Sequence, residues 1–280
     1  MRLRLKSTEL FSLTSPTSNH TPDATITELP LANPPRPFIL PPMKNLLLLT
    51  AAVLLCTAAA SSAKAPDAGA VFTKEQQQAL NPAQALDLLK EGNERFVGGV
   101  SIQRDLREQA TATAGGQFPF AAVVNCLDSR ASAELVFDQG LGDIFNARIA
   151  GNIVNDDILG SLEFACKVVG AKLIAVIGHT SCGAVMGAVD KVDLGNLTGL
   201  LQRIEPAVVE ADKQVEGERS SKDAALVAAV TVENVLLQMK NIRNKSPILK
   251  EMIDKGQIAL VGGVQDLGTG KVTFLDAEKN

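Results

Sequence analysis

The chain has 280 residues, of which 46% are hydrophobic and 21% are charged, a composition sufficient for one large soluble domain or two small ones. Its formal net charge of −4 argues against nucleic acid or an anionic lipid surface as a partner. There is no Trp and no Tyr, so only Phe can supply aromatic contacts.

The first 65 residues are typical of a leader rather than of a folded domain. The stretch "MKNLLLLTAAVLLCTAAASSAKA" begins at Met43 with a lysine, continues with an apolar run and ends in small residues, the order found in a secretory signal peptide. The apolar run is shorter than the roughly 20 residues that span a membrane. We therefore expect residues 43–65 to be a signal peptide cleaved near Ala63, and residues 1–42 to be a non-native or disordered extension. Such a leader predicts a periplasmic protein with no membrane attachment after cleavage.

Residues 66–280 form one candidate domain, which begins with a helical arm. The stretch 73–80 has a helical composition. A second helix is expected over 81–99, because Asn81 is a natural N-cap and Pro82 fits the first helical position.

From residue 120 onward, short apolar runs alternate with helical stretches. The runs are rich in Val, Ile and Phe and cover 120–126, 143–150 and 172–179. Helices are expected at 132–139, 156–170, 196–217, 221–244 and 246–255, and two strands around a Gly-rich turn at 257–275. Runs that are apolar on both faces and alternate with helices indicate a parallel sheet covered on both sides. We therefore predict an α/β fold with a mostly parallel central sheet flanked by helices and a C-terminal antiparallel edge strand.

Two polar clusters follow strands of this predicted sheet. Cys126 ends the first strand in "VVNCLDSR", and His179 ends the third in "IGHTSCGAVMGA". His179 is also the only histidine that remains once the leader is removed. Ligands of open parallel sheets bind at the carboxyl ends of the strands, so both clusters are expected at the same edge.

The spacing of these residues predicts a metal site. Cys126 and Asp128 form C-x-D, while His179 and Cys182 form H-x-x-C. Two thiolates, one imidazole and one carboxylate suit tetrahedral Zn²⁺. A disulfide between the two cysteines is the alternative in an exported protein, but it leaves the histidine and the aspartate unexplained. Cys166, within a predicted helix, is expected to be a core residue, and the absence of C-x-x-C argues against a thiol oxidoreductase.

These residues also carry a resemblance to a known family. The stretch "NCLDSRASAELVFDQGLGDIFNARIAGN", followed by "IGHTSCGAVMGA", closely resembles the β-class carbonic anhydrases, over about residues 80–276. The resemblance implies a zinc enzyme in which zinc-bound hydroxide converts carbon dioxide reversibly to bicarbonate and a proton. Residues 66–280 would then be the catalytic domain. Leu127, where many relatives carry a small polar residue, is a departure, and we expect its side chain to point away from the metal.

The resemblance assigns roles to the clustered residues. It implies Cys126, His179 and Cys182 as zinc ligands, with Asp128 as a fourth ligand only in a closed state. In the open state Arg130 would hold Asp128 off the metal through a bidentate pair, so that the carboxylate accepts a hydrogen bond from the hydroxide. A purely structural ion pair is the alternative for these two residues.

Other positions match the substrate pocket of the family. Gln117 and the backbone N–H of Gly183 would donate to substrate oxygen. Phe145, Ala150 and Phe164 align with apolar positions lining the pocket, although core packing also explains each Phe. Part of that wall comes from a neighbouring subunit in the family, which implies a homodimer or homotetramer.

The family's closed members hold an inhibitory bicarbonate with a Trp–Arg–Tyr trap. Arg148 matches the arginine, but Val123 stands where the Trp would be and the chain has no Tyr. We therefore predict that this inhibitory site is missing and that the resting zinc site is open.

Two other functions remain open at this stage. The same scaffold could serve a zinc hydrolase of carbon disulfide or carbonyl sulfide. A non-catalytic zinc-binding module is the other alternative, but it would need four protein ligands and would have no use for Gln117 or Arg130.

Overall fold

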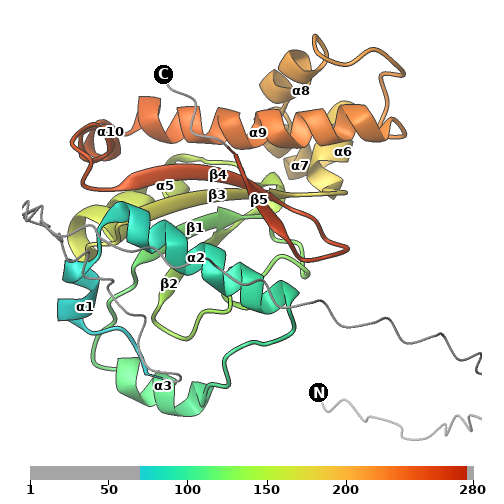
Figure 1. Ribbon diagram of the computed structural model, residues 1–280. Coiled ribbons are helices and arrows are strands. Elements are labelled where there is room, and N and C mark those ends of the chain that lie inside the picture. Colours follow the sequence, from blue (N-terminus) through green and yellow to red (C-terminus); the bar gives the residue numbers. More distant parts are fainter. Residues whose placement is uncertain (1–69, 276–280) are drawn as a thin grey trace, which may run out of the picture. The chain divides into compact units, whose positions relative to one another are not determined.

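The computed structural model describes residues 70–275, so the predicted extension and signal peptide lie outside the described residues. Within this range five strands form one sheet in the order β2-β1-β3-β4-β5 (Figure 1). The strands are β1 (Ala121–Asn125), β2 (Ile144–Arg148), β3 (Leu173–His179), β4 (Ala259–Gln265) and β5 (Val272–Phe274). The first four pair in parallel and β5 is antiparallel to β4, which confirms the predicted α/β fold and its antiparallel edge strand.

Helices cover both faces of the sheet, as the uninterrupted apolar runs predict. On β3, Leu173, Ala175 and Ile177 belong to the core cluster formed with α2 and α4, while Ile174 and Val176 belong to the opposite cluster. The first face carries α2 (Pro82–Val97) and α4 (Ala133–Val136), and the second carries α5 (Asp156–Glu163), the π-helix η2 (Phe164–Val169), α9 (Ala224–Lys245) and α10 (Pro247–Asp254). Figure 1 shows α2 and α9 on opposite sides of the sheet.

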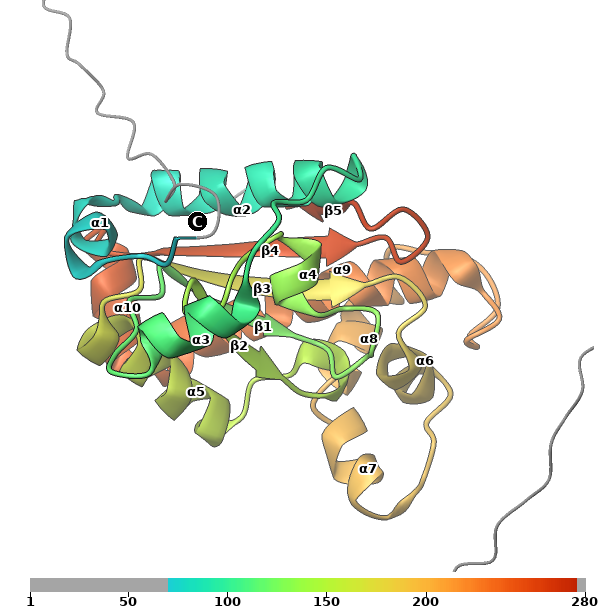
Figure 2. The ribbon, with the colours of Figure 1, turned by 90° about the horizontal axis from the view of Figure 1, so that it is seen from below.

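A third core cluster lies beyond the carboxyl ends of the strands. There α6 (Gly183–Val189), α7 (Gly195–Leu201) and α8 (Glu205–Ala211) pack with the first half of α9 (Figure 2). Cys126 and Cys182 belong to this cluster, which places the predicted metal ligands against apolar walls.

Several helix boundaries differ from the sequence prediction. The single helix expected over 196–217 is wrong, because the chain turns between α7 and α8, where Pro206 lies in the first turn of α8 and cannot continue a preceding helix. The prediction also missed α3 (Leu106–Thr113), because this helix is mostly polar and shows little apolar periodicity. Its start is marked by Asp105, which caps it. The predicted cap of α2 is confirmed, since Asn81 accepts from the Gln84 N–H with Pro82 in the first turn, and α1 (Lys74–Ala79) precedes it. No helix among residues 70–275 is long and apolar enough to cross a membrane.

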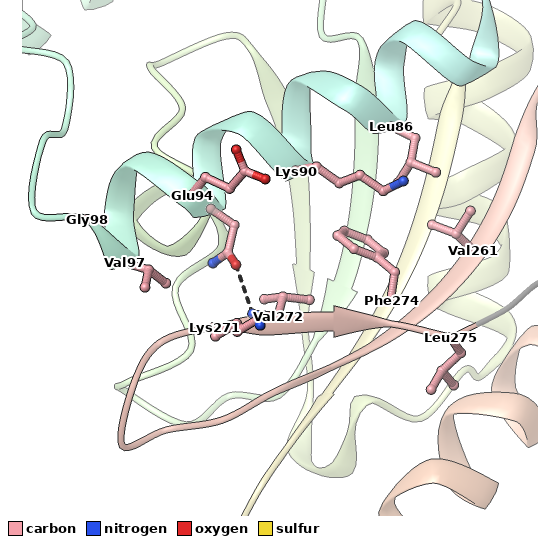
Figure 3. A pocket seen from close by; sticks show the side chains of 11 residues that line it. Leu86, Lys90, Glu94, Val97, Gly98, Val261, Lys271, Val272, Phe274 and Leu275 are labelled. Carbon is pink, nitrogen blue, oxygen red and sulfur yellow. Dashed lines mark hydrogen bonds between the residues drawn. The ribbon is translucent and has the colours of Figure 1, made fainter. Parts of the chain in front are cut away.

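A buried amide hydrogen-bonds to the edge strand β5. Asn93 of α2 is 5% exposed, and its Oδ1 accepts from the Val272 N–H at 2.8 Å. Its Nδ2 donates to the carbonyls of Val136 and Gly270 at 3.0 and 2.9 Å. The bond to Val272 lies beside an open groove of about 730 Å³ between α2 and β5 (Figure 3). The side chain therefore pairs one N–H of the edge strand that a further strand would otherwise pair.

A charged network fixes the helical arm to the sheet domain. The carboxylate of Asp138, just after α4, is 3% exposed and accepts from Arg95 Nε of α2 and from Arg104 Nη1 at 2.6 Å. The Ile102 N–H donates to the same carboxylate. Burial alone would raise the pKa of Asp138, but the hydrogen bonds from Arg95, Arg104 and Ile102 outweigh it and lower the pKa.

Asp138→Asn is expected to lower the free energy of unfolding by about 3 kcal/mol at neutral pH, because two partly buried guanidinium groups lose their counter-charge. Asn is the appropriate replacement because it tolerates the positive φ of this position. Urea unfolding of both proteins across pH measures the loss. The folded pKa is the lowered one, so the difference persists above about pH 4 and shrinks as pH falls through the folded pKa. Asp87→Asn, at an exposed position of α2, is the control, and a pH-independent difference would contradict the assignment.

Candidate metal centre and active site

Three distant ligand atoms converge at one edge of the sheet. Cys126 follows β1, His179 is the last residue of the adjacent parallel strand β3, and Cys182 is the N-cap of α6. Their ligand atoms all lie within 4.8 Å of one another, and all three residues are buried. The parallel pairing of β1 and β3 thus brings together the two predicted motifs.

The donor atoms of this cluster suit a thiophilic divalent cation. His179 Nδ1 lies 2.8 Å from the Thr180 carbonyl, which can only accept, so Nδ1 carries the proton and Nε2 keeps its lone pair. Nε2 is buried and has no hydrogen-bond partner among the described residues. The Cys126 and Cys182 sulfurs are 3.9 Å apart and both are free thiols, so the disulfide alternative does not describe this structure.

The contact between the two cysteines shifts their pKa values in opposite directions. The pKa of Cys126 falls to about 4, first because Cys182 donates to its sulfur and further because of His179, against the opposing effect of burial. The same contact, together with burial, raises the pKa of Cys182. Cys126 therefore ionises before Cys182, and a divalent cation bound to both sulfurs stabilises the two thiolates.

Asp128 is held beside the cluster by an arginine. Arg130 Nε donates to Asp128 Oδ1 at 2.9 Å and Nη2 donates to Oδ2 at 2.8 Å, a bidentate pair. The Arg130 N–H also donates to Oδ1 at 2.9 Å. These hydrogen bonds hold the pKa of Asp128 well below its usual range. The carboxylate is thus ionised and paired, and it is not part of the three-residue cluster.

The backbone that carries Asp128 is fixed by a second arginine. Arg148, at the end of β2, donates to the carbonyls of Cys126 and Leu127 at 3.2 and 3.1 Å and to that of Asp128. Leu127 is 60% exposed, so its side chain points away from the ligand cluster as predicted. Arg148 therefore supports the loop between the first ligand and the carboxylate.

The remaining predicted residues fall into two groups. Gly183 begins α6 directly after Cys182, and Ala150 begins the short helix η1 (Ala150–Asn152), so both lie near the cluster. Gln117 precedes β1 at the end opposite Cys126, and the five-residue strand alone spans about 16 Å.

Phe145 and Phe164 also lie away from the cluster within one chain. Their rings contact each other at 6.4 Å between centroids, and Phe145 packs against the core under α5 rather than against the one containing the cysteines. A single subunit therefore does not bring Gln117 and these rings to the ligand cluster.

Comparison with known proteins assigns the chain to a family. A family model described as "Carbonic anhydrase" matches residues 121–272. The "Carbonic anhydrase 2" of Mycobacterium tuberculosis is 36% identical over 202 residues, which cover 70% of this chain and 94% of the relative. This chain belongs to the β-class carbonic anhydrases.

Solved structures agree in fold with this carbonic anhydrase. A Coccomyxa β-carbonic anhydrase in complex with acetazolamide has a TM-score of 0.54 and 26% identity, covering 68% of this chain and 86% of the other. One of two tetrameric β-carbonic anhydrases from Sordaria macrospora has a TM-score of 0.54 and 23% identity, covering 61% and 91%. Cys126, His179 and Cys182 are the zinc site of the enzyme.

Gly151 of this carbonic anhydrase also contacts the zinc site, although the sequence pattern did not single it out. Its N–H lies 3.4 Å from the Cys126 sulfur and donates to it. Its φ is +66°, and an added Cβ would lie 2.6 Å from Ile204 Cδ1, a fully buried side chain. A glycine between the predicted strand end and Asn152 was the only available sign of this turn.

Gly151→Ala is expected to destabilise the enzyme by about 1–3 kcal/mol, because the left-handed backbone and the contact with Ile204 both oppose a methyl group. Urea unfolding of the zinc-free proteins gives this difference directly. Gly160→Ala on α5 is the control, since φ is not positive there and a Cβ would meet nothing within 4 Å. Equal losses in the two variants would show that the turn at Gly151 is not special.

Proposed function

We propose that Asp128, held by Arg130, orients the nucleophile for carbon dioxide hydration in this carbonic anhydrase. The observation that carries the proposal is the bidentate pair beside the zinc ligands. When bound, Zn²⁺ supplies a Lewis acid that lowers the pKa of a water molecule from about 15.7 to about 7.

The charge of Arg130 keeps the Asp128 carboxylate away from the metal position. A divalent cation with two thiolates is formally neutral and leaves room for one more ligand, so an unrestrained carboxylate could occupy that position. By neutralising Asp128 and fixing both of its oxygens, Arg130 keeps the carboxylate beside the cluster and off the metal. This arrangement corresponds to an open resting site.

The two oxygens of Asp128 differ in what they can still accept. Oδ1 accepts hydrogen bonds from the backbone N–H and from Nε of Arg130, which occupy its two lone pairs. Among the described residues, Oδ2 accepts a hydrogen bond only from Nη2, so one of its lone pairs stays available. We assign Oδ2 as the atom that accepts a hydrogen bond from the nucleophile, which orients the nucleophile toward carbon dioxide.

Gly183 gives the substrate a backbone donor with free space beside it. The residue is exposed, and a Cβ there would meet no atom within 4 Å. Its N–H is the donor that the family resemblance assigns to substrate oxygen, and Ala150 would contribute to the apolar wall on the side of η1.

A second subunit completes the proposed substrate pocket. Gln117, Phe145 and Phe164 match family positions that line the pocket, yet they lie away from their own chain's ligands. On η2, Phe164 is 54% exposed and Val168 71% exposed, and Phe164 contacts Phe145 of β2, which is the edge strand of the described sheet. We therefore propose at least a homodimer, and a tetramer of the kind formed by the Sordaria macrospora proteins is compatible with it. Analytical ultracentrifugation distinguishes these states from a monomer, which would contradict the proposal.

Export to the periplasm is proposed from the leader alone. Its support is the order of lysine, apolar run and small residues from Met43 onward. Expression of the full chain in a Gram-negative host, with N-terminal sequencing of the periplasmic fraction, is expected to give a mature protein that starts near Lys64. An uncleaved protein that stays in the cytoplasm would contradict export.

The activity itself is tested on protein that begins at Lys64. Stopped-flow hydration of carbon dioxide is expected to scale with the zinc content measured in the same sample. Hydrolysis of carbon disulfide, assayed side by side, is expected to be negligible. Rapid turnover in a metal-free sample, or a preference for carbon disulfide, would contradict the proposed function.

A further inference from the structure

A line of buried amides connects α9 to the zinc site. Asn234, Gln238 and Asn241 recur at intervals of four and three residues, and therefore share one face of the helix. Asn234 and Gln238 are fully buried. They lie among the buried apolar residues of α9, where unpaired amides would be costly.

The hydrogen bonds between these amides have a defined direction. The Val154 N–H donates to Gln238 Oε1 at 2.9 Å, so Gln238 Nε2 must face Asn234, whose Oδ1 accepts from it at 2.9 Å. Asn234 Nδ2 then donates to the Gly151 carbonyl at 2.8 Å. A backbone N–H at one end and a carbonyl at the other fix the orientation of both amides, because the first can only donate and the second can only accept.

The network holds η1 and the segment that follows it, and η1 contacts a zinc ligand. Gly151 is the central residue of η1 and Val154 lies two residues after its end, and each is bound by one of the two amides. The peptide group before Gly151 directs its N–H at the Cys126 sulfur, 3.4 Å away. An N–H that donates to a thiolate disperses its charge and restricts its position. Cys126, Asn234 and Gln238 are far apart in sequence, so only the fold joins them.

We propose that Asn234 and Gln238 are positioning residues for the zinc site. They hold η1 so that the Gly151 N–H points at the Cys126 sulfur, and in this way they set the geometry and charge of that ligand. Neither side chain hydrogen-bonds to Cys126, His179 or Cys182. The inference depends on the zinc site and not on the roles proposed for Asp128 and Arg130, so the two can fail independently.

The test compares Asn234→Leu and Gln238→Met, which keep the side-chain volume and remove the amides. Zinc affinity is measured by competition with a chromophoric chelator on the purified, zinc-free protein. We expect each variant to bind Zn²⁺ about 10–100-fold more weakly than the parent, the usual effect of losing an outer hydrogen-bond partner. Since the residues act in one chain of bonds, the double variant is expected to lose less than the product of the two single losses.

A spectroscopic measurement separates positioning from general stability. In Co²⁺-substituted protein the thiolate-to-metal charge-transfer band reports directly on the ligand sulfurs, and we expect it to shift in both variants. Thr231→Val is the matched control, because this buried threonine of α9 donates only to the Val227 carbonyl of its own helix. The control is expected to keep the parent's affinity and spectrum.

Parent-like zinc affinity together with an unshifted cobalt band in folded Asn234→Leu or Gln238→Met would overturn the proposal. Should both variants fail to fold, Asn241→Leu decides the question. Asn241 is half-buried and donates to Gln238 Oε1 at 3.2 Å, at the outer end of the network. A smaller weakening in the same direction supports the proposal, and an unchanged affinity refutes it.

Discussion

Cys182→Ala is expected to remove Zn²⁺ from the purified enzyme and to lower carbon dioxide hydration by about 10³-fold or more. Two remaining donors cannot hold the cation against solvent, and without it the pKa of water returns to about 15.7. Metal analysis and stopped-flow hydration on the same sample measure both effects. Extensive dialysis of the parent against a chelator is expected to reproduce the loss, and added Zn²⁺ should restore the parent but not the variant.

Cys166→Ala is the matched control for this substitution. Cys166 is also a buried free thiol, but burial raises its pKa to about 12 and it lies in the core under α5 and α10. The control variant is expected to keep its zinc and its activity. Zinc retained at full occupancy in Cys182→Ala would mean that the three-residue cluster is not the metal site.

Arg130→Ala and Asp128→Asn are expected to keep their zinc and to lose about 10²–10³-fold in turnover, the usual effect of removing one preorganised hydrogen-bonding group from a reacting centre. Arg130 is 60% exposed, so its removal does not disturb the core. Asp128→Asn keeps the size of the side chain but replaces an acceptor oxygen with a donor. The measurement is stopped-flow hydration at saturating carbon dioxide, with zinc content determined in parallel.

Arg107→Ala, at an exposed position of α3, is the control for a lost surface charge. It is expected to match the parent in both zinc content and turnover. Parent-like turnover in zinc-loaded Arg130→Ala would show that the Asp128–Arg130 contact is only a structural ion pair. Loss of zinc in the same variant would instead assign Arg130 a role in metal binding.

The sequence predicts the zinc ligands because their positions depend on local patterns. The apolar run before Cys126 and the one ending at His179 are strands in the structure, and parallel pairing brings the ends of β1 and β3 together. The H-x-x-C spacing then places Cys182 at the start of α6. Strand periodicity and the edge rule for parallel sheets bring the two motifs together, and the family resemblance then separates the three ligands from Asp128.

Contacts that depend on tertiary structure could not be predicted in this way. Gly151 lies 25 residues from Cys126 and Asn234 lies 83 residues from Gly151, and no periodicity connects them. The turn between α7 and α8 shows a related limit. The apolar pattern continues through this region, but Pro206 prevents one continuous helix. Gln117 shows a third limit, since the apolar pattern does not reveal that this residue lies at the end of β1 opposite Cys126 and away from its own chain's ligand cluster.

The amide of Asn93 has a consequence for how this protein behaves in concentrated solution. The sheet ends in a strand of only three residues, and the side chain of Asn93 occupies the N–H of Val272 in that strand. A hydrophobic replacement of Asn93 would free this N–H for an extended segment of another molecule. We therefore expect such a replacement to raise the tendency of the protein to associate as well as to lower its stability.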